Sequence, residues 1–252
     1  MATLPDPSLI PNPLRPFDTT RLALRAVRLP EDRPVFVALN DDHTGYINSS
    51  GPNITLPGPA EVTKYSEHVA NEVLVGAILW LKDAPSRTSD QVTLDALQGL
   101  PSQPNNTPIR SEYGIAIGEI HLERARPNMA HHRSTSIGLT ILPAYQGQGY
   151  GGEAIEWALD YAFRRAGMHR VGIGAFGWNS GALRLYERLG FKIEGRARQA
   201  LWHEGAWWDI IEFGMLEGEW WESKKKREEK ASQEAEEGRR TNRAIRIDTS
   251  ED

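Results

Sequence analysis

A glycine-rich turn near the middle of the chain, residues 146–152, has the sequence Gln-Gly-Gln-Gly-Tyr-Gly-Gly. It follows a strand-like run at residues 135–142 and opens a helix-like run at residues 153–165. Glycine leaves backbone N–H groups accessible to a ligand, and the start of a helix adds unpaired donors and a partial positive charge. The turn is therefore expected to bind an anion, most often a phosphate group.

Two better-known phosphate loops share this outline. The nucleoside triphosphate loop ends in Gly-Lys-Ser/Thr, whereas Glu153 follows the last glycine here. The dinucleotide fingerprint Gly-x-Gly-x-x-Gly is satisfied by Gly147, Gly149 and Gly152, but it needs an acidic residue on the next strand. That strand, residues 170–176, has no carboxylate. The dinucleotide interpretation is disfavoured, and an ordinary tight turn that caps a helix stays open as a purely structural alternative.

A second motif follows at residues 179–191, with the sequence Asn-Ser-Gly-Ala-Leu-Arg-Leu-Tyr-Glu-Arg-Leu-Gly-Phe. Together with residues 146–151, which fit the pattern Gln/Arg-x-x-Gly-x-Gly/Ala, it closely resembles the GNAT superfamily of N-acetyltransferases. The resemblance is strongest over residues 135–191 and extends more loosely over residues 20–220. A long Trp-rich terminal hairpin looks most like the branch that contains ribosomal-protein N-terminal acetyltransferases, which also includes enzymes acting on small amines.

The resemblance implies that acetyl-CoA binds along these two motifs. In the GNAT fold two central strands splay apart and pantetheine lies between them, and the matching segments here are residues 135–142 and 170–176. Backbone groups of Leu139 and Ile141 are expected to contact the pantetheine and acetyl region, and the glycine turn the pyrophosphate. The implied cofactor-binding residues are Leu139, Ile141, Gln146, Gly147, Gln148, Gly149, Tyr150, Gly151, Gly152 and Asn179.

Asn179 and Tyr186 are seven residues apart, almost two helical turns, so both project from nearly the same face of a helix. In the family the matching Asn contacts CoA and the matching Tyr often protonates the departing thiolate, so Tyr186 is the implied catalytic acid. A structural alternative stays open. Asn179 and Gly190 suit the caps of the helix, and Tyr186 suits a core stripe with Ala182 and Leu189.

The general base is expected on the strand-like segment 113–122. An amine must be neutral to attack a thioester, so a group that accepts its proton is needed. Regular alternation puts Glu119 and His121 on one face with Ile115 and Ile117. Glu119 is the first catalytic candidate because its strand should neighbour the cofactor strand, and His121 is the second. Alternatively, Glu119 marks the point where that face reaches solvent.

Carboxylates of the terminal hairpin offer another role, because they could attract a cationic amine. These carboxylates are Glu204, Asp209 and Glu212. Surface carboxylates are common in proteins, so the assignment of this role to the hairpin carboxylates is weak.

Composition favours a globular enzyme. The chain has 252 residues, of which 39% are hydrophobic and 25% charged, enough for one large domain or two small ones. It has no cysteine, which excludes disulfides, thiolate zinc sites and an acyl-cysteine intermediate, and no metal is expected. The net charge of −5 argues against broad nucleic-acid binding. The longest apolar run, residues 73–81, is too short to span a bilayer, and the N-terminus lacks a secretion signal pattern. A cytoplasmic protein is expected, with a nuclear location left open.

The elements that position these residues alternate between strand-like and helix-like patterns. This favours a single α/β (α+β) domain, and the resemblance implies a central, mostly antiparallel mixed sheet with splayed central strands flanked by helices. Strands are expected at residues 21–28, 73–82, 113–122, 135–142 and 170–176, with a hairpin over 191–216 that turns at His203-Glu204-Gly205. A first helix is expected to start within residues 30–32 and to end at residue 40, and further helices are expected at 60–72, 153–165 and 179–190. Residues 45–59, rich in Gly and Pro, are expected to be mostly loop.

The remaining segments are assigned no chemistry. They are an irregular leader at 1–16, an insertion at 83–110 with at most one short helix near 92–97, and a charged tail at 222–252. The tail is expected to be disordered or marginally helical. The acetyltransferase domain is therefore expected at residues 17–221. The basic cluster at 224–227 suits a localisation or nucleic-acid patch, or simply a solvated tail.

The resulting hypothesis is a direct transfer of acetyl from acetyl-CoA to a primary amine in a ternary complex. The acceptor is a protein N-terminus or a small amine, a homodimer is compatible with it, and no membrane or nucleic-acid partner is expected. A non-catalytic acyl-CoA-binding module that uses the same cleft for sensing or assembly is the alternative.

Overall fold

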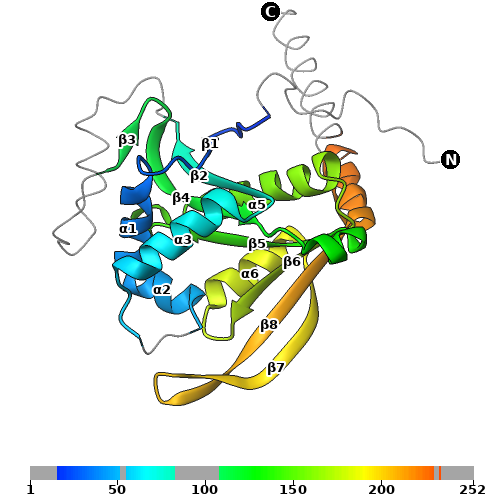
Figure 1. The fold of residues 1–252 in the computed structure, drawn as a ribbon. Helices are drawn as coiled ribbons and strands as arrows, with labels where there is room; N and C mark the ends of the chain where they lie inside the picture. Colours follow the sequence, from blue (N-terminus) through cyan, green and yellow to red (C-terminus); the bar gives the residue numbers. More distant parts are fainter. Residues whose placement is uncertain (1–15, 52–54, 83–107, 230–232, 234–252) are drawn as a thin grey trace, which may run out of the picture.

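The computed structural model describes residues 16–51, 55–82, 108–229 and 233, which form one sheet covered by helices (Figure 1). The strands are β1 (Leu22–Ala26), β2 (Val75–Leu81), β3 (Arg110–Ser111), β4 (Gly114–Leu122), β5 (Ser134–Ile141), β6 (Arg170–Phe176), β7 (Lys192–His203) and β8 (Ala206–Leu216). The α-helices are α1 (Arg33–Asp41), α2 (His43–Ser49), α3 (Pro59–Asn71), α5 (Tyr150–Asp160) and α6 (Ser180–Leu189). Short helical turns are η2 (Pro127–His132), η3 (Pro143–Tyr145) and the π-helical η4 (Tyr161–Arg165) that continues α5.

The strand order is β1-β2-β4-β5-β6-β8-β7, with β3 paired to β4. Every pairing is antiparallel except that of β5 with β6. This parallel pairing joins residues 134–136 to residues 170–172, after which the two strands separate. The structure confirms the predicted mixed, mostly antiparallel sheet with two splayed central strands.

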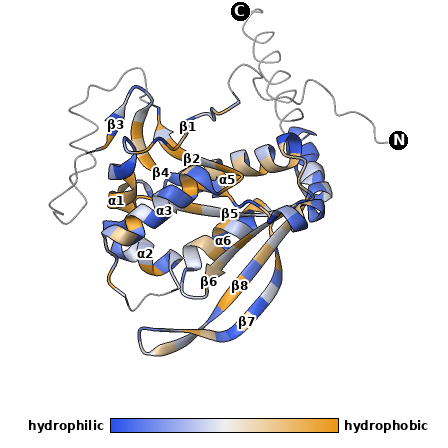
Figure 2. Cartoon of the chain, viewed as in Figure 1, coloured by the Kyte–Doolittle hydropathy of each residue, from blue (hydrophilic) through white to orange (hydrophobic). Residues whose placement is uncertain are grey.

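Two hydrophobic clusters cover opposite faces of the sheet. On one face α1 and α3 pack on β2 through the buried residues Val35, Phe36, Val62, Val69, Ile78 and Trp80. On the other face α5 packs through the predicted stripe Ile155, Ala158, Leu159 and Ala162, all at most 1% exposed. Figure 2 shows that the protruding hairpin differs from this core, because β7 is mostly hydrophilic. Among the described residues, no helix is long and apolar enough to cross a membrane.

Strand β4 contains a β-bulge that sequence alternation did not predict. Its register against β2 shifts near Ile117, so the alternation of side chains reverses at this point. Ile115 and Ile117 belong to the cluster under α5. Glu119 and His121 lie on the opposite face, where Glu119 contacts Tyr65 of α3 and the His121 ring contacts His68 of α3. The expectation that these four side chains share a face was therefore wrong.

Helix α2 lies in a segment that was expected to be mostly loop, and that expectation was wrong over residues 45–49. Its glycine content disfavours a helix locally, but tertiary contacts outweigh this preference. The Trp178 indole N–H donates to Asn48 Oδ1 at 3.1 Å and fastens the helix to the end of β6.

Residues 217–229 form a helix, so the expected start of the tail at 222 falls inside it. Trp220 is 4% exposed and packs against Phe163 with ring centroids 5.5 Å apart. Lys224 Nζ lies 3.1 Å from Asp160 Oδ1, which ties the helix to the end of α5. The predictions for residues 1–15, 52–54, 83–107, 230–232 and 234–252 lie outside the described residues.

Candidate active site

A cavity of about 600 Å³ opens between β5 and β6 where the two strands separate. Residues 137–141 of β5 and 173–176 of β6 form its walls, and α2 contributes Gly45, Asn48 and Ser49. The cavity brings together nine of the predicted cofactor residues: Leu139, Ile141, Gln146, Gly147, Gly149, Tyr150, Gly151, Gly152 and Asn179. Gln148 is not part of this lining, and its side-chain amide donates to the Ala144 carbonyl at 2.9 Å.

The glycine turn holds a conformation that favours glycine. Gly147 and Gly149 have φ angles of 71° and 84°, in the left-handed region, and Gly149 is the N-cap of α5. A Cβ added at Gly147 would meet no atom within 4 Å, so the space beside the turn is open to a ligand. The Gln146 side-chain amide donates to the Ile141 carbonyl at 2.7 Å and fixes the turn to the end of β5. The first N–H groups of α5 thus border the cavity, as an anion site requires.

Arg21 contributes a positive charge to this turn, which sequence reasoning missed. Its guanidinium lies 4.3 Å from the centroid of the Tyr150 ring and donates to the Gln148 carbonyl at 2.9 Å. A salt bridge of 2.7 Å joins Arg21 Nε to Glu153 Oε2. No local signal in the sequence connects Arg21 to the turn, because β1 reaches it only in the folded sheet.

Glu153 anchors the N-terminal segment to the start of α5. It accepts hydrogen bonds from the Thr19 hydroxyl at 2.5 Å and from the Arg21 backbone N–H at 2.8 Å, besides the salt bridge. Burial alone would raise the pKa of Glu153, but these hydrogen bonds and the Arg21 charge outweigh burial and lower that pKa. The carboxylate is therefore charged at neutral pH and holds Arg21 beside the glycine turn.

Asn179 and Tyr186 of α6 both line the cavity. Asn179 also caps the helix, because its side-chain oxygen accepts the Ala182 N–H at 3.1 Å. Tyr186 packs edge-on against Phe213, with ring centroids 5.6 Å apart, and is 9% exposed. Both residues thus have the structural roles that the sequence suggested, and both also line the cavity. Burial raises the pKa of Tyr186 to about 12, so its hydroxyl keeps its proton at neutral pH.

Glu119 lies behind the cavity wall. It is fully buried, so the alternative that it marks a solvent-facing end of the strand was wrong. The Tyr65 hydroxyl donates to Glu119 Oε1 at 2.6 Å, and His121 Nδ1 lies 3.0 Å from Oε2. Burial and the Glu119 carboxylate raise the pKa of Tyr65, and Tyr65 also hydrogen-bonds the Thr140 side chain. Thr140, the register partner of Glu119, does line the cavity.

The acetyltransferase (GNAT) domain family matches residues 21–192, more than half of the chain. The chain belongs to this family. The match contains β1, the glycine turn, Glu119, Asn179 and Tyr186, and it therefore covers the whole set of elements around the cavity.

The curated relatives of this GNAT domain are N-acetyltransferases by name, and the chain spans about half the length of those it matches. It is 30% identical over 89 residues to spermidine N(1)-acetyltransferase of Vibrio cholerae, covering 35% of the chain and 51% of the relative. It is 33% identical over 89 residues to YdaF of Bacillus subtilis, covering 35% and 49%. YdaF carries the name "putative ribosomal N-acetyltransferase".

Solved structures share the GNAT fold. The structure of spermidine N-acetyltransferase from Vibrio cholerae in complex with CoA and spermine aligns with a TM-score of 0.56. It is 21% identical, and the alignment covers 80% of this chain and 99% of that one. At this identity the likeness shows the fold alone.

The three hairpin carboxylates, which follow the matched residues 21–192, lie in different surroundings. Glu204 stands in the exposed turn of the hairpin, and Asp209 is paired with Arg196 at 2.9 Å. Glu212 lies over Gly174, because a Cβ added to that glycine would be 3.4 Å from Glu212 Oε2. Gly174 lines the cavity, so Glu212 is the carboxylate of this set beside it.

Aromatic side chains join the hairpin to α2 at the end of β6. The Trp178 ring stacks on His203 with centroids 4.2 Å apart and meets Trp208 edge-on. Phe176, which lines the cavity, contacts Trp178 at a centroid distance of 4.8 Å. The sequence predicted a Trp-rich hairpin, but its aromatic contact with the cavity residue Phe176 was not predicted.

Proposed function

We propose that this chain is an acetyl-CoA-dependent N-acetyltransferase that acts on a primary amine. The observation that carries the proposal is the cavity between β5 and β6, which brings the glycine turn and the Tyr186 ring to one space. Membership of the GNAT family supports the choice of acetyl-CoA as the donor. The 30% identical segment shared with spermidine N(1)-acetyltransferase of Vibrio cholerae supports an amine acceptor.

The donor would bind along the separated strands. Backbone groups that do not pair between strands need other partners, and β5 offers such groups toward β6 beyond residue 136. The amide-containing pantetheine arm suits this edge, at Leu139 and Ile141. The pyrophosphate would lie on the N–H groups of the glycine turn and the first turn of α5, with Arg21 adding a positive charge.

The reaction we propose is a direct attack by the amine on the thioester. The amine nitrogen bonds to the carbonyl carbon, the carbon–sulfur bond breaks, and the nitrogen loses one proton. Tyr186 would donate a hydrogen bond, and then a proton, to the departing sulfur, because its raised pKa keeps the hydroxyl protonated.

Glu119 stays our proposal for the group that receives the amine proton. Because Glu119 lies behind the wall, the Tyr65 hydroxyl would connect it to the cavity beside Thr140. The acceptor would approach between α2 and the hairpin, where Glu212 could attract a cationic amine. A peptide N-terminus and a polyamine both satisfy this chemistry.

The test is a CoA-release assay with acetyl-CoA and a panel of amines: spermidine, spermine, a free-N-terminus peptide and a lysine peptide. We expect turnover of at least one amine, a large loss of kcat in Tyr186→Phe, and loss of cofactor binding in Gly149→Glu. Tight acetyl-CoA binding without turnover of any amine would instead favour a sensing or assembly module. No affinity for acetyl-CoA would overturn both functions.

A further inference from the structure

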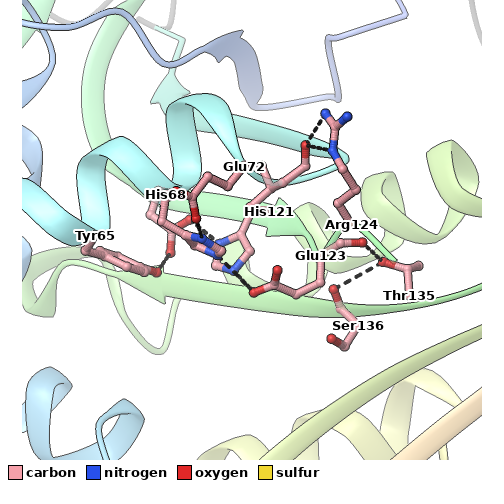
Figure 3. A network of polar contacts seen from close by, with 10 residues as sticks. Tyr65, His68, Glu72, His121, Glu123, Arg124, Thr135 and Ser136 are labelled. Carbon is pink, nitrogen blue, oxygen red and sulfur yellow. Dashed lines mark hydrogen bonds and ion pairs between the residues drawn. The ribbon is translucent and has the colours of Figure 1, made fainter. Parts of the chain in front are cut away.

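A second group of titratable side chains lies on the α3 face of the sheet, outside the cavity. It consists of His68 on α3, Glu72 at the C-cap of α3, His121 on β4, and Glu123 just after β4 (Figure 3). His121 is 6% exposed, while the side chains of His68 and Glu123 are 30% and 42% exposed. The group therefore extends from the core to the surface, and the proposed acetyl transfer uses neither of its solvent-facing members.

Three donor atoms of this group converge on one point. His68 Nε2 lies 3.1 Å and His121 Nε2 lies 3.5 Å from Glu123 Oε1. One ligand atom from each of the three residues lies within 4.8 Å of the others. A tetrahedral zinc ion with bonds of about 2.0–2.2 Å separates its ligand atoms by roughly 3.3–3.5 Å. The two measured distances are close to this separation, so small side-chain rotations would complete the site.

The other nitrogen of each ring is already held by a carboxylate. His121 Nδ1 lies 3.0 Å from Glu119 Oε2, and His68 Nδ1 lies 3.0 Å from Glu72 Oε2. Metal-binding histidines commonly donate this second N–H to a carboxylate, which fixes the ring and directs the free lone pair at the metal. Both histidines have this arrangement, and both direct Nε2 at the same Glu123 oxygen.

When both imidazoles are neutral, the group has an excess of hydrogen-bond acceptors and no positive charge. All four ring nitrogens face carboxylate oxygens, which only accept hydrogen bonds. A neutral imidazole has one N–H, and in each ring the Nδ1 contact uses it. The two Nε2 lone pairs would then face the Glu123 carboxylate without a hydrogen between them. Burial opposes protonation of His121, but the neighbouring carboxylates raise the pKa of both histidines, so protonated rings also relieve this repulsion. A divalent cation at the point where the three atoms meet would take the place of those protons.

The surrounding backbone holds the ligands in place. Gly138 on β5 leaves room for the His121 ring, because a Cβ there would lie 2.1 Å from His121 Cε1. The Thr135 hydroxyl donates to the Glu123 carbonyl at 2.7 Å, and the Arg124 guanidinium donates to the Val73 carbonyl at 2.8 Å (Figure 3). The end of β4 is thus fixed to both of its neighbouring strands.

We propose that His68, His121 and Glu123 bind a Zn²⁺ ion that joins α3 to the end of β4. Two imidazoles and one carboxylate suit zinc, whereas Mg²⁺ and Ca²⁺ prefer oxygen ligands. The exposure of His68 and Glu123 leaves a solvent-facing position for a water as the fourth ligand. The inference does not depend on the proposed acetyl transfer, because its ligands lie outside the cavity.

The experiment uses the full chain, treated with EDTA and then desalted, and titrated with ZnCl2 by isothermal calorimetry. We expect one equivalent of Zn²⁺ to bind and Tm to rise, with no such change for MgCl2 or CaCl2. His68→Gln and Glu123→Gln should each weaken binding more than tenfold. Both side chains are partly exposed, so the variants should fold, which circular dichroism would verify.

Two further variants make the outcome decisive. Glu72→Gln removes a carboxylate that orients His68 and should weaken zinc binding by a smaller factor than the ligand variants. His132→Gln is the matched control, since the exposed His131–His132 pair lies elsewhere on the chain and should not affect binding. Absence of Zn²⁺ binding, or binding that is lost in His132→Gln and kept in His68→Gln and Glu123→Gln, would overturn the proposal.

Discussion

Arg21 lies 4.3 Å from the centroid of the Tyr150 ring, although Arg21 precedes the first strand and Tyr150 begins the helix after β5. The contact places a guanidinium beside the glycine turn, and Glu153 holds it there through a salt bridge of 2.7 Å. The proposed pyrophosphate site thus combines backbone donors from one motif with a charge from Arg21, directly before β1. This relationship can be tested separately from catalysis.

Arg21→Gln should raise the KM for acetyl-CoA about tenfold, because a charge-assisted contact to phosphate is worth roughly 1.5 kcal/mol. The kcat value should change less, since Arg21 contacts the glycine turn and is not among the residues that line the cavity beside Tyr186. Steady-state kinetics over a range of acetyl-CoA concentrations would measure both. Arg28→Gln, an exposed arginine just after β1, is the matched control and should leave KM unchanged. An equal KM in the two variants would contradict the role of Arg21.

Glu153→Gln should destabilise the fold by about 1 kcal/mol at pH 7, after allowance for partial solvent screening. The pKa of Glu153 is lowered in the fold, so its stabilising effect is present above the unfolded pKa and is lost as pH falls through the folded pKa. The difference in Tm between wild type and variant should therefore shrink in acid.

Thermal unfolding from pH 7 down to pH 3 would measure this difference. Glu156→Gln on the same helix is the control, because its side chain is 47% exposed and pairs with Arg227 of the C-terminal helix. A Glu153→Gln difference that stayed constant across this pH range would show that the hydrogen bonds, and not the charge, stabilise the fold.

Sequence patterns predicted the elements whose residues are close together in the chain. The strand at 170–176 coincides with β6, and the caps Asn179 and Gly190 delimit α6 as expected. Periodicity and capping are local properties, so they can be read without the fold. The glycine turn and Tyr186 came together in the cavity because both motifs start directly after the two splayed strands.

Features that depend on distant contacts were not predictable. The bulge in β4 moved Glu119 away from the face of Ile117, because one extra residue reverses the alternation. Helix α2 forms where local propensity disfavours it, since Trp178 and the adjoining strands hold it. Arg21 reaches the glycine turn only after β1 joins the sheet. Each of these errors has a tertiary cause.

Tyr186→Phe should lower kcat by about 10²–10⁴-fold and leave the KM for acetyl-CoA nearly unchanged, because the ring still lines the cavity and only the proton donor is lost. The pKa of Tyr186 is about 12, so the wild-type rate should show no alkaline decrease from this hydroxyl up to pH 10. A pH–kcat profile would check both statements.

Tyr161→Phe is the matched control for this variant. Tyr161 begins the π-helical turn after α5 and lies outside the cavity lining, so its hydroxyl should not matter for turnover. If Tyr186→Phe retained the full kcat, Tyr186 would be a core aromatic only and the leaving thiolate would take its proton from solvent.

Gly138→Ala should destabilise the fold by about 1–3 kcal/mol, the usual cost of forcing an extra methyl group into a packed site. The added Cβ would lie 2.1 Å from His121 Cε1, so the imidazole must move and its contacts with Glu119 and Glu123 must weaken. Urea unfolding measures the change in free energy. Gly218→Ala is the control, because a Cβ there meets nothing within 4 Å and the residue is helical, so alanine should be neutral or stabilising. Equal stability of the two variants would mean that the His121 ring has room to move. Gly138 would then not hold the His121 ring rigidly in the site that it shares with His68 and Glu123.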